Sequence, residues 1–196
     1  MDKFKNKYRI STVRLQNWDY SWAAVYFITI CTHDRLSYFG EIIKGKMQLS
    51  SIGEIVESEW LKTFELRKDM NLYMGEFVIM PNHFHAIIGI CENSYNTQRN
   101  THRRDAMHCV STFPNHTLDS DTLKSKNKFM PQSKNLASII RGFKSSVTVN
   151  ACKINIDFRW QSRFHDHIIR NNDSFNRITN YIIHNPANWQ EDNFFN

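Results

Sequence analysis

Two apolar runs in the middle of the chain constrain the fold most, because only Pro81 and Asn82 separate them. Leu72–Met80 and His83–Ile90 are rich in β-branched and aromatic residues, which is typical of buried strands. Proline followed by asparagine indicates a turn or a bulge. The region is therefore either two strands joined by a turn or one long strand kinked at Pro81, and both alternatives place a sheet at the centre of the fold.

The segments around this region alternate between strand and helix patterns. Residues 24–32 have the composition of a buried strand, and residues 40–50 predict a hairpin that turns near Lys44-Gly45. Apolar residues recur at helical spacing in three further segments. Ser51 and Ser133 are the expected N-caps of the first two helices, and the third helix begins at about Asp173. This order predicts an α+β fold, namely a ferredoxin-like, largely antiparallel sheet with helices on one face.

At 196 residues the chain has the length of a single domain, and we expect one domain over residues 1–196. Residues 92–132 are polar and lack a sustained period, which indicates a flexible insertion. The net charge of +6 favours polyanionic partners such as nucleic acid or an acidic membrane surface. There is no apolar run near the roughly 20 residues that span a bilayer, so we expect a cytoplasmic protein without a membrane partner.

A pair of histidines, His83 and His85, lies at the start of the second apolar run. Successive side chains of a strand point to opposite faces, so the two imidazoles point the same way. Two converging imidazoles suit a divalent metal, but a third oxygen or nitrogen ligand must come from elsewhere in the fold. The alternative is two histidines on a polar strand face, hydrogen-bonded to water and to neighbouring groups.

A second group of polar residues lies in the last predicted helix. Tyr181 and Asn185 are four residues apart and share a helix face beside an apolar stripe of Phe175, Ile178 and Ile182. A phenol and an amide oxygen could therefore reach the same pocket. Taken singly, the tyrosine is equally consistent with the edge of a core, and the asparagine with a C-terminal helix cap.

Three blocks of sequence together resemble the REP-associated tyrosine transposases, which belong to the HUH single-tyrosine transposase superfamily. The blocks are MPNHFHAII, WQSRFHDHIIRN and NYIIHNPANW, and the opening RLQNWDYSWAAVYFITICTHDRLSYFGEI is also similar to that family. The resemblance covers nearly the whole chain except residues 92–132. An isolated His-x-His pair is a weak signal, whereas three blocks in this order are a strong one.

The resemblance implies that the chain is a metal-dependent endonuclease and strand transferase that acts on single-stranded or hairpin DNA. It implies that His83 and His85 hold Mg²⁺ or Mn²⁺ and that Tyr181 is the nucleophile, which forms a 5′-phosphotyrosine. Asn185 lies where related enzymes carry a polar third ligand; close relatives outside this branch use glutamine there. Relatives work as monomers or as homodimers, and the sequence leaves both states open.

Basic and aromatic residues that flank these blocks are candidates for DNA contacts, because they combine phosphate-binding charge with faces for stacking. The candidates are Arg9, Arg14, Trp18, Tyr20, Lys134, Arg141 and Lys144. Two other functions remain open at this stage: a domesticated DNA-binding regulator that does not cleave, and a hydrolase in which the metal activates water. The hydrolase differs from the transposase in predicting that Tyr181 is dispensable.

Overall fold

A four-stranded antiparallel sheet forms the centre of the protein, with the strand order β4-β5-β1-β6. The structure is a computed structural model that describes residue 15, residues 18–97 and residues 133–195. The strands are β1 (Ala24–Cys31), β4 (Leu72–Met80), β5 (His83–Ile90) and β6 (His165–Ile169). The two central apolar runs are thus two antiparallel strands joined by the turn at Pro81 and Asn82, and they pair from Met80 with His83 outward.

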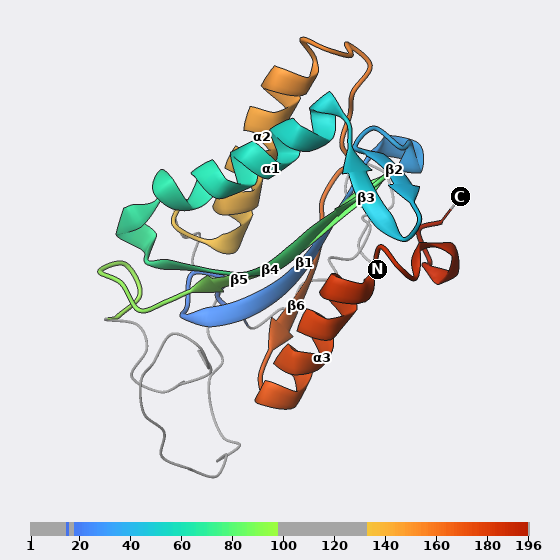
Figure 1. Ribbon diagram of the computed structural model, residues 1–196. Helices are drawn as coiled ribbons and strands as arrows, with labels where there is room; N and C mark the ends of the chain where they lie inside the picture. The colour runs from blue at the N-terminus through green and yellow to red at the C-terminus, as the bar shows by residue number, and fades with distance from the viewer. Residues whose placement is uncertain (1–14, 16–17, 98–132, 196) are drawn as a thin grey trace, which may run out of the picture.

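The predicted hairpin forms a small sheet of its own, made of β2 (Gly40–Ile43) and β3 (Lys46–Leu49). Its turn residues Lys44 and Gly45 both have positive φ angles, of 51° and 74°. Positive φ at both central residues is what a two-residue turn between twisted strands requires, and glycine adopts it without a steric penalty. The hairpin lies next to the C-terminal end of the chain (Figure 1).

Helices cover both faces of the main sheet (Figure 1). Helices α1 (Ser51–Glu65) and α2 (Leu136–Ala151) pack on one face, and α3 (Asn172–His184) lies against the other. The predicted α+β class and antiparallel sheet are confirmed, and the position of α3 adds a second helical layer to the expected one. All eight residues of β5 are buried, because this strand has neighbours on both faces and both edges.

The strand alternation divides the core into two parts. Phe84, Ala86 and Ile88 of β5 join the large cluster beneath α1 and α2, while Ile87 joins a small cluster with Ile182 of α3. The side chains of His83 and His85 share the orientation of Ile87. The histidine pair therefore lies on the α3 face of the sheet.

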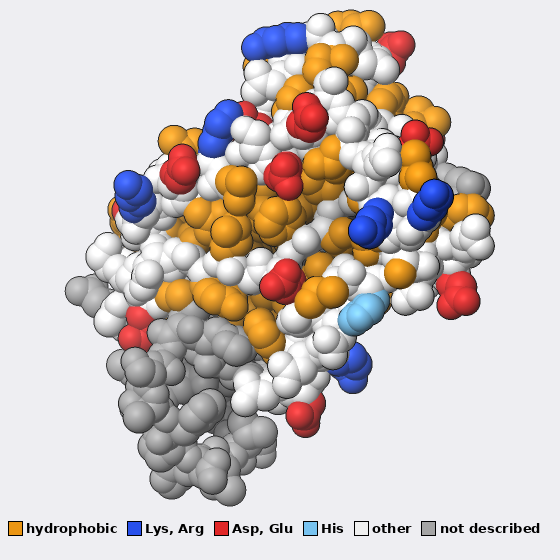
Figure 2. Space-filling view, viewed as in Figure 1, with side chains coloured by type: hydrophobic (Ala, Val, Ile, Leu, Met, Phe, Trp, Pro, Cys, Tyr) orange, Lys and Arg blue, Asp and Glu red, His pale blue; other side chains and the backbone are white. Residues whose placement is uncertain are grey.

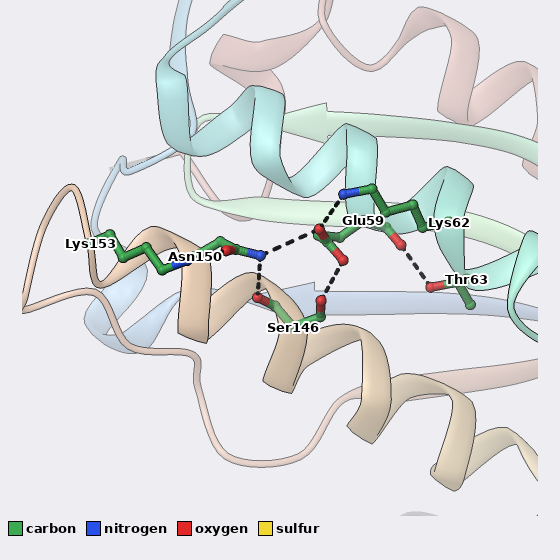
Figure 3. A network of polar contacts seen from close by, with 6 residues as sticks. All are labelled: Glu59, Lys62, Thr63, Ser146, Asn150 and Lys153. Atoms are coloured by element: carbon green, nitrogen blue, oxygen red, sulfur yellow. Dashed lines mark hydrogen bonds and ion pairs between the residues drawn. The ribbon is translucent and has the colours of Figure 1, made fainter.

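Helices α1 and α2 are joined by a polar network around Glu59, shown in Figure 3. The Glu59 carboxylate accepts hydrogen bonds from Lys62 at 2.8 Å, from the amide of Asn150 at 3.4 Å and from the Ser146 hydroxyl. Lys153 in turn donates to the side chain of Asn150 at 3.0 Å. Both carboxylate oxygens have partners, so this buried charge needs nothing from outside the protein.

The surface seen in Figure 2 carries hydrophobic side chains between α1 and the edge strand β4. Basic and acidic side chains are interspersed around them, without a concentrated positive patch on this face. Within the described part of the chain, none of the helices is long and apolar enough to cross a membrane.

Candidate metal and tyrosine site

The two histidines of β5 come together at the end of the sheet where β5 begins. Their ring centroids are 4.5 Å apart, and His83 and His85 are 0% and 1% exposed. In the pairing of β1 with β5, His85 lies opposite Thr29 and His83 opposite Cys31. The expected convergence of the two imidazoles on one point is therefore confirmed by the geometry of the strand.

Hydrogen bonds to the Nδ1 atoms of His83 and His85 fix the orientation of both rings. The Nδ1 atom of His83 lies 2.9 Å from Oδ1 of Asn82, an acceptor, so this nitrogen carries the proton. The Nδ1 atom of His85 is hydrogen-bonded to the hydroxyl of Thr29 at 2.8 Å. The Nε2 atom of His83 is thereby left with its lone pair, and it has no hydrogen-bond partner although it is buried.

Burial keeps both histidines neutral. Removal from water lowers the pKa of His83 to about 3, and the positive charge of Arg35 acts in the same direction. The pKa of His85 is held well below its usual value, first by burial and then by repulsion from His83. Neutral imidazoles with available lone pairs are the form that binds a metal ion.

Helix α3 brings Tyr181 to this pair. The hydroxyl of Tyr181 lies 3.2 Å from Nε2 of His85 and donates to Oδ2 of Asp192 at 3.4 Å. Burial, followed by the negative charge of Asp192, raises the pKa of Tyr181 to about 12, so the side chain is a neutral phenol near pH 7. Tyr181 as a whole is still 42% exposed, so the residue is accessible to solvent.

Asn185, one turn further along, lies beside Tyr181 as expected from the spacing of four residues. Its Nδ2 donates to Oδ2 of Asp192 at 2.8 Å, while its Oδ1 is buried and has no partner. Asp192 follows a short turn, η4 (Trp189–Glu191). The sequence does not predict Asp192 as part of the site, because an isolated aspartate in the irregular segment after the last helix carries no signal without the fold.

The residues present fit a divalent metal ion. One ligand atom each from His83, His85 and Asp192 lie within 4.8 Å of one another. Nitrogen and carboxylate ligands of this kind suit Mn²⁺ and Zn²⁺, and Mg²⁺ less well. The partnerless Nε2 of His83 and Oδ1 of Asn185 are further evidence, since buried polar atoms without partners are rare and indicate a missing ligand.

The C-terminal segment, residues 189–195, covers the histidine pair. The ring of Phe194 lies 4.5 Å from that of His83 and 5.9 Å from that of His85, measured between centroids. The carbonyl oxygen of Phe194 accepts a hydrogen bond from Asn82 at 2.8 Å. These contacts help to shield the two imidazoles from solvent.

The predicted DNA contacts near the N-terminus divide into two groups. Arg9 and Arg14 lie outside the described residues. Trp18 is only 7% exposed, and its Nε1 donates to the hydroxyl of Tyr26 at 3.0 Å, so little of its ring is left to stack on a base. Tyr20 is half-buried and stacks on Tyr26 at 5.7 Å between centroids. For these two aromatic residues a role in the core explains the position better than DNA binding.

The basic residues of the second predicted helix belong to the layer on the opposite face of the sheet. Lys134 forms an ion pair with Asp69, and Arg141 is exposed on α2. The ammonium group of Lys144 donates to the carbonyl oxygens of Gln161 and Arg163 at 2.7 and 3.0 Å, and burial lowers its pKa to about 8. Their role in DNA binding remains a prediction.

Two known proteins are similar to this chain, one in sequence and one in fold. No family model matches the chain. An uncharacterized protein of Haemophilus influenzae (strain Rd) is 33% identical over 185 residues, which cover 94% of this chain and 92% of that protein. A solved structure of a REP-associated tyrosine transposase bound to a REP hairpin superposes with a TM-score of 0.55 at 19% identity, covering 92% of this chain and 74% of the other.

Proposed function

We propose that this chain, which belongs to the same family as the Haemophilus influenzae protein and has the fold of the REP-associated tyrosine transposases, is a metal-dependent enzyme that cuts and rejoins single-stranded DNA. The proposed substrate is a DNA hairpin with single-stranded flanks, and the structural neighbour is bound to a REP hairpin. The observation that carries the proposal is the position of the Tyr181 hydroxyl, 3.2 Å from Nε2 of His85 in a cluster with partnerless polar atoms.

The metal ligands in this proposal are His83, His85 and an oxygen from Asp192 or Asn185. When bound, the metal supplies Lewis-acid stabilisation of the charge that develops on the phosphate oxygens. The strand β5 holds the two imidazoles in place, and Asn82 and Thr29 fix their orientation.

Tyr181 acts as the nucleophile. Its phenolic oxygen forms a bond to phosphorus, the bond from phosphorus to the 3′ oxygen breaks, and the products are a 5′-phosphotyrosine and a free 3′-hydroxyl. With a pKa of about 12 the phenol must lose its proton during attack, and Oδ2 of Asp192, at 3.4 Å, is placed to accept it. The covalent link conserves the energy of the broken bond, so rejoining needs no nucleotide cofactor.

The experiment that tests this proposal mixes the full-length protein with labelled hairpin DNA and Mn²⁺ or Mg²⁺ and looks for an adduct that survives SDS. We expect an adduct that depends on the metal and disappears in Tyr181→Phe. Tyr95→Phe is the matched control, because Tyr95 is also 42% exposed but hydrogen-bonds to Asp69, away from the histidines. An adduct that persists in Tyr181→Phe would contradict the proposed nucleophile.

The second candidate function, hydrolysis by metal-activated water, is favoured by one observation. Two histidines and a carboxylate, as in His83, His85 and Asp192, also form the ligand sets of hydrolytic metal sites. The same assay separates the two functions: the hydrolase cleaves DNA in the Tyr181→Phe variant and leaves no adduct in either protein. Binding without cleavage on any hairpin would instead favour the non-cleaving regulator.

A further inference from the structure

Arg35 lies in a tight turn at the mouth of the histidine site. This turn, η1 (His33–Arg35), follows β1 directly, and both Asp34 and Arg35 have positive φ angles, of 51° and 55°. Two consecutive residues other than glycine in the left-handed region are uncommon and cost free energy. Strain of this kind persists where the surrounding structure holds it in place, often at functional sites.

The turn is held by the residue that also orients His83. The backbone N–H of Thr32 and its hydroxyl both donate to the carbonyl oxygen of Asn82, each at 2.9 Å. Thr32 is fully buried, and the single proton of its hydroxyl can be donated instead to the carbonyl oxygen of Leu36, at 2.8 Å. The turn that carries Arg35 and the side chain that orients His83 are thus parts of one rigid unit.

The guanidinium of Arg35 lies against the C-terminal segment that covers the histidine site. Its charge acts on His83, and on Cys31, which pairs with His83 across the sheet. Its carbon Cζ lies 5.1 Å from the centroid of the Phe194 ring, which in turn lies against His83. Arg35 is therefore an exposed cation beside the segment that covers the two histidines, and it is carried on a fixed backbone.

An oxygen acceptor already occupies the position that this guanidinium faces. Nη1 of Arg35 donates at 3.0 Å to the carbonyl oxygen of Asn193, which lies between Asp192 and Phe194 in the C-terminal segment. When that segment moves aside to admit DNA, a phosphate oxygen can take the place of this carbonyl. Arginine presents several N–H donors in a planar fork that matches a phosphate group.

We propose that Arg35 binds the scissile phosphate beside the metal and stabilises its charge while Tyr181 attacks. This inference rests on the proposed function, because it assigns a further substrate-binding residue to the same site. It also explains the strained turn: the backbone holds Arg35 at the one end of the sheet where the imidazoles, the phenol and the phosphate meet.

Lys144 is the other cation that acts on Cys31, but its position differs. Its ammonium group already donates to two backbone carbonyl oxygens and lies over the Trp160 ring at 5.7 Å. These contacts join α2 to the segment that leads into β6, and they are typical of a structural role. Arg35 is exposed and contacts the segment that covers the two histidines, so it is the better phosphate ligand.

The test measures DNA binding and adduct formation in parallel for Arg35→Ala, Arg35→Lys and the control Lys153→Ala. Lys153 is an exposed cation that contacts Asn150 in the outer helical layer, so its loss removes the same charge elsewhere. Binding of a fluorescein-labelled hairpin with single-stranded flanks is followed by anisotropy in Mn²⁺ over a range of salt concentrations. The binding experiments use a Tyr181→Phe background, so that no adduct forms.

We expect Arg35→Ala to weaken binding about tenfold, and to reduce the slope of log affinity against log salt by about 0.7, the value for one phosphate contact on a single strand. Arg35→Lys should restore the slope, and Lys153→Ala should leave it unchanged. With Tyr181 present, Arg35→Ala should slow adduct formation about 100-fold. If Arg35 only held the C-terminal segment through Asn193 and Phe194, Arg35→Ala would ease DNA entry and raise the affinity. A lower affinity in Arg35→Ala therefore indicates a lost phosphate contact, and a higher affinity indicates a released segment.

Unchanged or tighter binding with an unchanged salt slope in Arg35→Ala would overturn the inference. If the wild type forms a Tyr181-dependent adduct and Arg35→Ala forms it equally fast, the proposed function stands and the role of Arg35 fails. If the salt slope depends on Arg35 but the wild type forms no adduct, the phosphate contact stands and the proposed function fails.

Discussion

Two buried polar clusters lie on opposite faces of the same sheet, and they differ in how completely their atoms are paired. The network around Glu59 between α1 and α2 supplies partners for both carboxylate oxygens (Figure 3). In the cluster on the α3 face, Nε2 of His83 and Oδ1 of Asn185 have none. Burying polar atoms without partners costs free energy, so a cluster that keeps them is expected to gain from a ligand.

The comparison separates a structural role from a functional one. Glu59 joins two helices and has all its partners within the described residues. The histidine cluster contains neutral imidazoles, a phenol and a carboxylate whose mutual hydrogen bonds still leave two buried polar atoms without partners. Two other buried atoms without partners belong to Trp60 and Thr179, and neither residue is part of the possible metal-binding group. It is therefore the grouping of partnerless atoms with metal-binding side chains that points to chemistry.

The largest effect should come from removing one imidazole. We expect His83→Gln to weaken Mn²⁺ binding at least about 100-fold, because the variant loses a direct ligand, whereas loss of an outer-shell partner typically costs about 10- to 100-fold. Glu59→Gln should leave the affinity unchanged. Isothermal titration calorimetry with Mn²⁺ measures both, and equal losses in the two variants would show that the histidine cluster is not the metal site.

The identity of the third ligand gives a smaller difference. A carboxylate is a stronger ligand for Mn²⁺ than a neutral amide, so Asp192→Asn should weaken Mn²⁺ binding about tenfold or more, and Asn185→Ala by less. Glu191→Gln is the matched control, since it removes a neighbouring charge that is not part of the cluster. The reverse order of the two effects, measured by the same calorimetry, would assign the third ligand to Asn185.

The Glu59 network should affect stability without affecting chemistry. Glu59→Gln replaces a charged acceptor of three hydrogen bonds, and we expect the free energy of unfolding to fall by about 1 to 3 kcal/mol. Adduct formation and Mn²⁺ affinity should stay at wild-type values. Urea unfolding of this variant beside Glu57→Gln, an exposed glutamate of the same helix, measures the difference. A loss of adduct formation in folded Glu59→Gln would show that the two clusters are coupled.

Much of the fold could be predicted from the sequence because local signals and tertiary packing agree. The strand 83–90 and the apolar stripe of α3 follow from composition and period, and the observed bounds differ little. The caps differ by one or two residues: Ser50 caps α1 rather than Ser51, and Asn135 caps α2 rather than Ser133. Several polar residues stand before each helix, and only the backbone geometry decides which of them faces the first turn.

The site was predictable only in part. His83, His85 and Tyr181 lie in ordered elements whose periodicity fixes the direction of the side chains, and the structure brings them together. Asp192, Phe194 and Arg35 lie in irregular segments, where no period predicts direction, and they reach the site through contacts between residues far apart in the chain. The basic residues of α2 have the charge expected of a DNA contact but lie in the helical layer on the other face of the sheet. Charge alone does not predict the face on which a helix packs.

The smallest expected effect is a difference in the pH ranges over which the two clusters change stability. His83 has a pKa of about 3 in the folded protein and about 6.5 when unfolded, so between these values the unfolded state binds a proton that the folded state does not. Its stability contribution is fully present above about pH 6.5 and is lost as the pH falls. For Glu59 burial raises the pKa, but hydrogen bonds from Lys62 and Ser146 outweigh it and the net shift is downward. The Glu59 contribution is therefore lost only below its unfolded pKa, near 4.5.

Urea unfolding in EDTA at pH 7, 6 and 5 separates these two ranges. Between pH 7 and pH 5 the wild type should lose roughly 1 to 2 kcal/mol of stability through His83, in addition to a similar loss through His85 and smaller losses from other groups. His83→Gln should lose less stability over this pH range, because the contribution of His83 is absent. The contribution of His85, whose pKa is also lowered, should remain in that variant. Glu59→Gln should lose stability in parallel with the wild type over the same range and diverge from it only in more acidic solution. Parallel curves for the wild type and His83→Gln between pH 7 and pH 5 would mean that the imidazole is solvated in the metal-free protein, and the contrast between a satisfied and an unsatisfied cluster would no longer hold.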